Sequence, residues 1–258
     1  MQLNAQFRPA QPGPVVVLIH GLFGSLDNLG LLAKALGEAG FGVLSLDLRN
    51  HGRSPHSPEH TYPAMVTDLL ALLDEQGLAE VSLVGHSMGG KVAMQCALRH
   101  PQRVKQLVVV DMAPADYLPG EHDAVFAGLH AVARQAPLTR VQADACLAQH
   151  LTDPAVRQFL LKSFLPGAQP CWRFNLAALQ ANYPQILAWP AVEGSYPGPS
   201  LFIKGELSPY LQPHHQGAIA GLFPRAKARL VLGAGHWLHA EKPLLFNKLV
   251  VDFLSASS

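Results

Sequence analysis

A serine between glycines is the first feature of the sequence that could carry out chemistry. Residues Gly85–Gly89 read G-H-S-M-G, which fits the pattern G-x-S-x-G; they follow the apolar run Val81–Val84 and precede a small-residue helix that Pro101 stops. On such a strand-to-helix turn the serine adopts strained backbone and its hydroxyl is raised above the sheet, while a Cβ at either glycine would collide with neighbouring chain. We therefore interpret Ser87 as a nucleophile rather than as an incidental serine in a glycine-rich turn.

The nucleophile needs a base, because a serine hydroxyl barely ionises near neutral pH. For a serine on this kind of turn the expected chain order is serine, acid, histidine, with the histidine on the loop after the last strand. His236 has that position and is the predicted base. His20 and His86 flank backbone turns and are predicted to be structural, whereas His51 could line a pocket but precedes Ser87 in the chain.

The remaining parts of such a site are an acid and two oxyanion donors. Asp111 ends the strand after the serine's helix, and Glu206 follows the next-to-last strand, so both lie at the carboxyl edge of a parallel sheet and either could reach His236. An acid that accepts the imidazole N–H fixes the tautomer of the base. The backbone amides of Leu22, which follows a His-Gly pair, and of Met88 are the predicted oxyanion donors.

Strands and helices alternate along most of the chain, which predicts a mostly parallel central sheet with helices on both faces. The expected strands, besides the one before Ser87, are Leu3–Phe7 at an edge, Val15–His20, Phe41–Leu48, Gln106–Asp111, Ser200–Lys204 and Ala228–Leu232. The expected helices are Asp27–Ala39, a helix from Pro63 that Thr61 caps, Lys91–Arg99, Pro213–Leu222 and Pro243–Leu254.

Strand signals disappear between residues 112 and 199. Helical stretches separated by Pro and Gly take their place, roughly Glu121–Gln135, Leu138–His150, Pro154–Phe164 and Trp172–Ala188. We interpret residues 112–199 as a helical cap inserted over the carboxyl edge of the sheet, and residues 1–111 and 200–258 as the α/β core.

Composition narrows the class of protein. Of the 258 residues 49% are hydrophobic and 14% are charged, so a sizeable core is expected, and a net charge of +1 gives no electrostatic case for nucleic acid or an anionic membrane. No apolar run approaches a membrane span and the first residues lack signal-peptide features, so we expect a cytoplasmic protein. Cys96, Cys146 and Cys171 are too far apart for a disulfide framework or a zinc site, and reduced, buried thiols are expected.

Eight stretches spread over nearly the whole chain resemble the α/β-hydrolase superfamily, and within it the YbfF-type esterases. The G-x-S-x-G turn points only to the superfamily, whereas the stretches in the predicted cap and the S-P-Y segment give the narrower resemblance. The stretches are HGLFGSLDNLG (His20–Gly30), DLRNHGRSP (Asp47–Pro55), GHSMGGK (Gly85–Lys91), DMAPADY (Asp111–Tyr117), FLLKSF (Phe159–Phe164), WRFN (Trp172–Asn175), SPY (Ser208–Tyr210) and GAGHWLHAEKP (Gly233–Pro243).

The resemblance bears on the choice of acid. Many α/β-hydrolases carry it after the penultimate strand in a G-x-x-D pattern, but Gly205–Ser208 reads G-E-L-S here, so Ser208 stands at that position and cannot carry a charge. Similarity to the YbfF-type esterases implies the acid on the earlier strand, which is Asp111. Glu206 remains the rival acid.

The resemblance implies a serine hydrolase that cleaves carboxylic esters with short to medium acyl chains, with acyl-CoA thioesters as a further substrate class. The expected partner is thus a small acyl ester or thioester, and no cofactor is needed. His236 and His239 form an H-x-x-H pair without a third ligand, so no metal is expected. A carbon–carbon hydrolase or a cofactor-free haloperoxidase would use the same triad, and a non-catalytic ligand-binding homologue would use the same scaffold.

Several side chains are candidates for contact with the substrate. Arg49 and Arg173 could face an anionic group such as a carboxylate or a CoA phosphate, or they could be solvated surface residues. The candidates for lining the acyl pocket are Asn28, Trp172, Tyr183, Tyr210 and Trp237.

Overall fold

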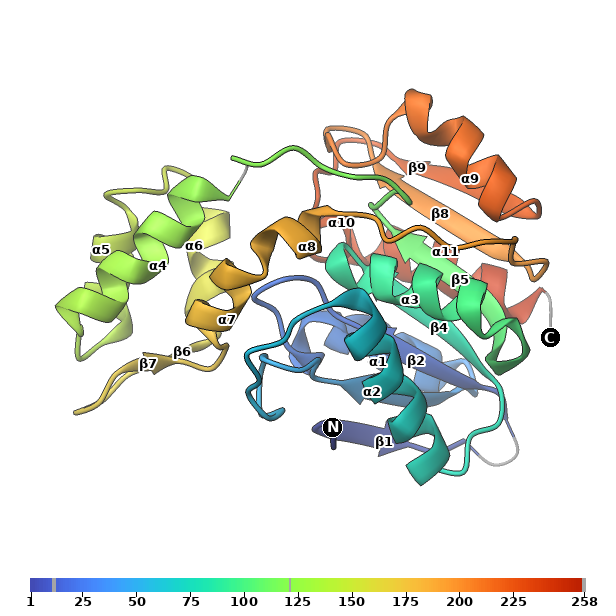
Figure 1. The fold of residues 1–258 in the computed structure, drawn as a ribbon, viewed down its shortest axis with the longest axis horizontal. Coiled ribbons are helices and arrows are strands. Elements are labelled where there is room, and N and C mark those ends of the chain that lie inside the picture. Colours follow the sequence, from blue (N-terminus) through green and yellow to red (C-terminus); the bar gives the residue numbers. More distant parts are fainter. Residues whose placement is uncertain (11–12, 121, 257–258) are drawn as a thin grey trace.

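The computed structural model describes residues 1–10, 13–120 and 122–256. Within these residues a seven-stranded sheet forms the centre of the molecule, in the order β1-β3-β2-β4-β5-β8-β9 (Figure 1). Strand β1 runs antiparallel to β3 and every other neighbouring pair is parallel, so the expected α/β class is confirmed. The strands are β1 (Ala5–Arg8), β2 (Val15–Ile19), β3 (Gly42–Leu46), β4 (Val81–His86), β5 (Val104–Val110), β8 (Ser200–Gly205) and β9 (Ala226–Val231).

Helices cover both faces of this sheet because its central strands are apolar on both sides. In β2, Val17 and Ile19 join the core beneath α2 (Tyr62–Glu75) and α3 (Met88–Arg99). Val16 and Leu18 point the opposite way and join the second core, beneath α1 (Gly30–Glu38) and α11 (Pro243–Ser255). A strand alternates its side chains between faces, so a continuous apolar run feeds two cores at once. Shorter elements are α9 (Gln216–Leu222), α10 (Leu238–Glu241) and the 3-10 turns Leu26–Leu29, Pro101–Arg103 and Pro213–His215.

The chain between β5 and β8 contains helices that extend beyond one edge of the sheet (Figure 1). These are α4 (Asp123–Gln135), α5 (Arg140–Leu147), α6 (Pro154–Leu161), α7 (Leu176–Ala181) and α8 (Tyr183–Leu187). The start expected for α4 at Glu121 lies outside the described residues.

The expectation that this segment has no strands is wrong, as is the helix expected over Trp172–Ala188. A short hairpin, β6 (Phe164–Leu165) with β7 (Cys171–Trp172), follows α6. Two short helices then replace the long one, since Asn175 caps the first at 3.3 Å and Pro184 occupies the first turn of the second.

The chain that returns from the insertion to β8 is held against α3. Lys91 Nζ donates to two carbonyl oxygens at 2.7 and 2.9 Å, Gln95 Nε2 to one at 2.8 Å and Arg99 to one at 3.3 Å, all within residues 187–191. The three donors are four residues apart and therefore occupy one stripe of the helix. Helix α3, which begins directly after Ser87, thus holds the return connection in place.

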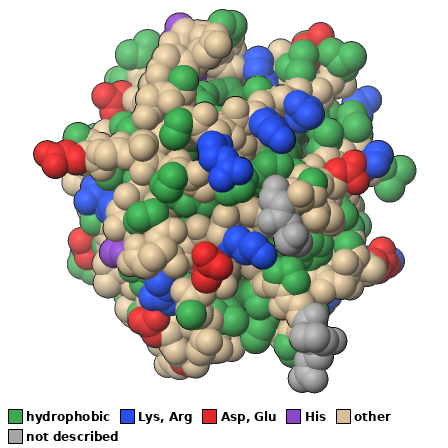
Figure 2. Space-filling view, turned by 90° about the vertical axis from the view of Figure 1, so that its right-hand side faces the viewer, with side chains coloured by type: hydrophobic (Ala, Val, Ile, Leu, Met, Phe, Trp, Pro, Cys, Tyr) green, Lys and Arg blue, Asp and Glu red, His purple; other side chains and the backbone are tan. Residues whose placement is uncertain are grey.

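Figure 2 shows charged side chains of both signs spread over one face of the molecule. On the face drawn in Figure 2, Lys and Arg side chains are interspersed with Asp and Glu and with uncharged residues. None of the helices in the described ranges combines the length and the apolar character that a bilayer crossing demands.

Cys96 and Cys146 are buried thiols, but Cys171 is exposed on the hairpin, which corrects the expectation that all three are buried.

Candidate active site

Ser87 lies on a sharp turn between β4 and α3. Its backbone has φ 55° and ψ −123°, a left-handed conformation that costs free energy in a residue with a side chain, and its N–H donates to Val110 O at 3.0 Å. The flanking glycines permit the turn: a Cβ at Gly85 would lie 2.2 Å from the Gly89 carbonyl oxygen, and one at Gly89 would lie 2.4 Å from that of Ile19. The sharp turn expected from G-x-S-x-G is therefore present.

The structure brings Ser87, His236 and Asp111 together from three separate parts of the chain. His236 Nε2 lies 3.0 Å from Ser87 Oγ, and His236 Nδ1 lies 2.7 Å from Asp111 Oδ2. The carboxylate can only accept, so it fixes the proton on Nδ1 and leaves Nε2 free to accept from the serine hydroxyl. This is the geometry of an activated serine nucleophile.

Asp111 is fully buried and is held by residues at the end of β8 and just after it. Gly205 N donates to its Oδ1 at 3.1 Å, and the hydroxyl of Ser208 donates to Oδ2, the oxygen that also accepts from His236. The Asp111 backbone is itself left-handed, with φ 53°. Ser208 therefore supports the carboxylate from the very position where a G-x-x-D sequence would place an acid.

Glu206, the rival acid, points elsewhere. Its Oε2 accepts from Gly233 N at 2.7 Å on the exposed side of the loop that carries His236. Glu241 accepts from Gly235 N at 2.8 Å, and His86 Nε2 donates to the His236 carbonyl oxygen at 2.9 Å. These side chains brace the loop, so Glu206 supports the base through backbone contacts and leaves the imidazole to Asp111.

The backbone of Leu22 and of Met88 lies beside Ser87. The turn that carries Leu22 packs so closely on the nucleophile that a Cβ at Gly21 would lie 3.1 Å from Ser87 Cβ. Met88 is the first residue of α3, and the first amides of a helix have no partner within it. The turn of Leu22 and the first residue of α3 thus both lie next to Ser87, as expected for two backbone oxyanion donors, and their role stays a prediction.

A cavity of about 200 Å³ opens onto Ser87 and His236. Asn28, Tyr210 and Trp237 line it, as expected for three of the predicted pocket residues. Sequence reasoning missed Val156, Phe159 and Leu160 of α6, although their spacing is that of one helix face. The other lining residues are Gly21, Leu22, Phe23, His86, His122, Val125 and His239.

Trp172 and Tyr183 do not line this cavity, so that part of the prediction is wrong. Trp172 is buried inside the insertion, where Nε1 donates to Leu129 O at 3.1 Å and the indole stacks on Phe174. The Tyr183 hydroxyl lies 2.6 Å from His122 Nδ1, and its ring lines a separate cavity of about 550 Å³.

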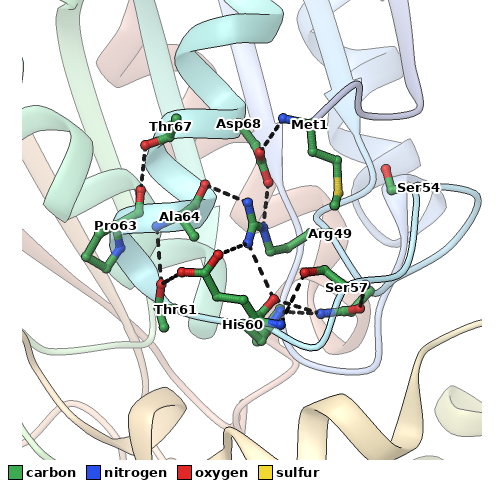
Figure 3. Close-up of polar contacts among 12 residues, drawn as sticks. Met1, Arg49, Ser54, Ser57, His60, Thr61, Pro63, Ala64, Thr67 and Asp68 are labelled. Carbon is green, nitrogen blue, oxygen red and sulfur yellow. Dashed lines mark hydrogen bonds and ion pairs between the residues drawn. The ribbon is translucent and has the colours of Figure 1, made fainter.

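Arg49 is not a solvated surface residue, because it is buried in ion pairs within the chain. It is 6% exposed, and Nε donates to Asp68 at 2.6 Å while Nη1 donates to Glu59 at 3.0 Å (Figure 3). The N-terminal amine of Met1 completes the network on Asp68 at 2.7 Å. Arg173 lines another surface cavity, of about 290 Å³, away from Ser87.

Two further histidines pack around the base in uncharged form. Burial lowers the pKa of His86 well below its ordinary value, and repulsion from His239 and His236 lowers it further. Burial, followed by repulsion from His236, lowers the pKa of His239 to about 4. The rings of His86 and His236 are 4.8 Å apart, so the neutral His86 ring places no positive charge beside His236.

Comparison with known proteins shows the family to which the chain belongs. The family model for the alpha/beta hydrolase fold matches residues 14–152, and the chain belongs to this family. It is 44% identical to esterase YbfF of Escherichia coli (strain K12) over 246 residues, which cover 94% of this chain and 95% of the relative.

More distant relatives agree with this placement. The chain is 43% identical over 249 residues to the sn-1-specific diacylglycerol lipase ABHD11 of Mus musculus, covering 94% of this chain and 81% of that protein. A solved marine microorganism esterase superposes with a TM-score of 0.93 at 34% identity, covering 98% of this chain and 99% of that one. The resemblance to YbfF-type esterases is confirmed, and the protein is a carboxylic ester hydrolase.

Proposed function

We propose that this protein hydrolyses carboxylic esters of short to medium acyl chains through an acyl-enzyme on Ser87, with Asp111 and His236 completing the triad. The observation that carries the proposal is the continuous hydrogen-bonded path from Asp111 Oδ2 through His236 to Ser87 Oγ, at 2.7 and 3.0 Å. A small, largely apolar cavity ends at this path, which gives an acyl group a place to lie.

In the first half of the reaction, Ser87 Oγ attacks the acyl carbon while its proton passes to His236 Nε2. The carbonyl oxygen takes up the electron pair and is stabilised by the amides of Leu22 and Met88. Asp111 stabilises the imidazolium that forms. When the tetrahedral adduct collapses, the bond from the acyl carbon to the leaving oxygen breaks, and His236 returns the proton to the departing alcohol.

In the second half, water takes the place of the alcohol. His236 Nε2 accepts a proton from the water as its oxygen attacks the acyl carbon, and the same two amides hold the oxyanion. The bond between the acyl carbon and Ser87 Oγ then breaks, and the proton on His236 restores the serine hydroxyl. A thioester follows the same path with a thiol as leaving group.

The size of the cavity supports a limit on acyl length. Its volume of about 200 Å³ is below the ~300–1,000 Å³ that is typical of pockets for drug-sized ligands. Val125 of α4 and Phe159 of α6 form part of its wall, so residues 112–199 are proposed to act as the cap that sets acyl preference.

The test combines covalent labelling with an activity panel. A fluorophosphonate should label Ser87 at one equivalent, and Ser87→Ala should lose both the label and the hydrolysis of p-nitrophenyl butyrate. Ser195→Ala, at an exposed serine outside the site, serves as the control and should retain both. A series of p-nitrophenyl esters and acyl-CoA thioesters of graded length then measures the substrate class. Full activity of Ser87→Ala would refute the mechanism.

A further inference from the structure

Two buried histidines hold the turn that carries Leu22. His20 donates from Nδ1 to Gly21 O at 2.8 Å, and its Nε2 accepts from Leu48 N at 3.0 Å. His51 has the same protonation pattern: Nδ1 donates to Arg49 O at 3.0 Å, and Nε2 accepts from Phe23 N at 3.1 Å. A carbonyl only accepts and a backbone N–H only donates, so these partners require both rings to be neutral with the proton on Nδ1.

These contacts fix the peptide planes on both sides of the Leu22 Cα atom. The Leu22 N–H belongs to the same plane as the Gly21 carbonyl oxygen, which His20 holds. The next plane contains the Phe23 N–H, which His51 holds. With both planes held, the orientation of the Leu22 N–H is set before any substrate binds.

The second plane needs support because Phe23 is strained. Its φ of 62° lies in the left-handed region, which a bulky side chain rarely occupies. Such conformations cost about 1–3 kcal/mol and persist only where surrounding contacts enforce them. His51 is fully buried and, contrary to the expectation that it could line the pocket, it does not line the cavity at Ser87. Its contact with the site is through the backbone.

We propose that His51 is a positioning residue for the oxyanion hole, in which its Nε2 acts as the acceptor that aligns the Leu22 amide with the developing oxyanion. The inference rests on the proposed function, because it assigns a role within the serine mechanism. It goes beyond the triad because it assigns His51, in the sequence R-N-H-G after β3, a role in stabilising the transition state.

Two substitutions separate the contacts of the ring. In His51→Gln, the longer amide can place an acceptor near the former Nε2 position, next to Phe23 N. In His51→Asn, the shorter amide can reproduce only the Nδ1 donor to Arg49 O. A positioning role predicts that Gln retains more activity than Asn, whereas a purely local structural role through Arg49 predicts the reverse.

We expect His51→Asn to lower kcat on p-nitrophenyl butyrate roughly ten- to hundredfold, as misplacement of one donor does. His51→Gln should stay within about fivefold of the original enzyme, since one acceptor replaces another. KM should change little in either variant, because His51 does not line the cavity at Ser87. Affinity for an alkyl boronic acid, which forms a tetrahedral adduct on serine, should fall in parallel with kcat.

Thermal melting of each variant gives the second readout. The side chain of the His51→Met variant has no strong acceptor. Its kcat should therefore equal that of His51→Asn, even if the two variants differ in melting temperature. Equal kcat in the Gln and Asn variants, or a loss that follows melting temperature alone, would overturn the proposal. One equivalent of fluorophosphonate on Ser87 in the original enzyme tests the serine mechanism separately, so the two failures are distinguishable.

Discussion

Ser208 donates a hydrogen bond to the same carboxylate oxygen of Asp111 that accepts from His236. The two residues follow adjacent parallel strands, β8 and β5, which explains how their side chains meet at one edge of the sheet. Where a G-x-x-D sequence would place an acid after the outer of these strands, this chain has Asp111 after the inner strand and the neutral donor Ser208 after the outer one. The residue at this position thus contacts the carboxylate of the proposed triad.

The first prediction concerns the identity of the acid. Asp111→Asn should lower kcat by about 10³–10⁴-fold, because the amide no longer holds the correct tautomer of His236 or stabilises its charge. Glu206→Gln should cost less than about tenfold, since it alters one exposed hydrogen bond to the Gly233 amide. Steady-state kinetics on one ester measures both, and the opposite order would assign the acid to Glu206.

Ser208 gives the second prediction. Ser208→Ala should lower kcat about tenfold, as loss of one hydrogen bond to a charged group does. Adding Ser208→Asp to Asp111→Asn places a carboxylate on the outer strand and should recover at least about tenfold over Asp111→Asn alone, since it again offers an acceptor to His236. No recovery would mean that the outer position cannot reach the imidazole in this fold.

Acyl preference should depend on Phe159. Its ring lines the cavity and lies 5.8 Å from that of Trp237, so Phe159→Ala should enlarge the space and move the optimum of kcat/KM toward longer acyl chains. Trp172→Phe is the matched control: it removes the hydrogen bond to Leu129 O and should lower the melting temperature without changing the preferred length. A shift in the control would contradict the assigned cavity.

Lys91 predicts a pH dependence of stability. Burial lowers its pKa to about 7 from the ordinary 10.5, although Asp116 opposes the shift. Between these values the unfolded chain binds more protons than the folded one at this side chain, so its contribution makes the free energy of unfolding rise with pH across that window.

Denaturant unfolding at a series of pH values measures this contribution. Lys91→Met should lack the rise, while Lys248→Met, at an exposed lysine, should retain it. Parallel pH curves for the original protein and Lys91→Met would show that Lys91 titrates normally.

Local pattern was enough to predict the sheet and the sharp turn at Ser87. The apolar run before His20 specifies a strand buried on both faces, and Gly85 and Gly89 specify a turn that no other residue fits. The chain order of strands also placed Asp111 and His236 at the same edge.

The contacts that buried polar and aromatic side chains make could not be predicted from the local sequence pattern. Arg49 is paired with Asp68 of α2 and with Glu59 of the loop before that helix, and the acceptor of Trp172 lies 43 residues away along the chain. Burial of such groups depends on partners that tertiary packing brings together. Ser208 could not be predicted as a partner of Asp111 for the same reason, since only the pairing of β5 with β8 brings the two residues together.

The stripe on α3 limits how evolution or an engineer can recombine this protein. Lys91, Gln95 and Arg99 belong to the core sequence, yet their hydrogen-bond acceptors are backbone carbonyls of the inserted segment, so this connection depends on the shape of the incoming chain rather than on its side chains. A protein with a foreign insertion should therefore still fold when the last residues of the insertion follow the same backbone path along α3, whatever their sequence. Melting temperatures of chimeras with and without the three donors would measure how far this exchangeability extends.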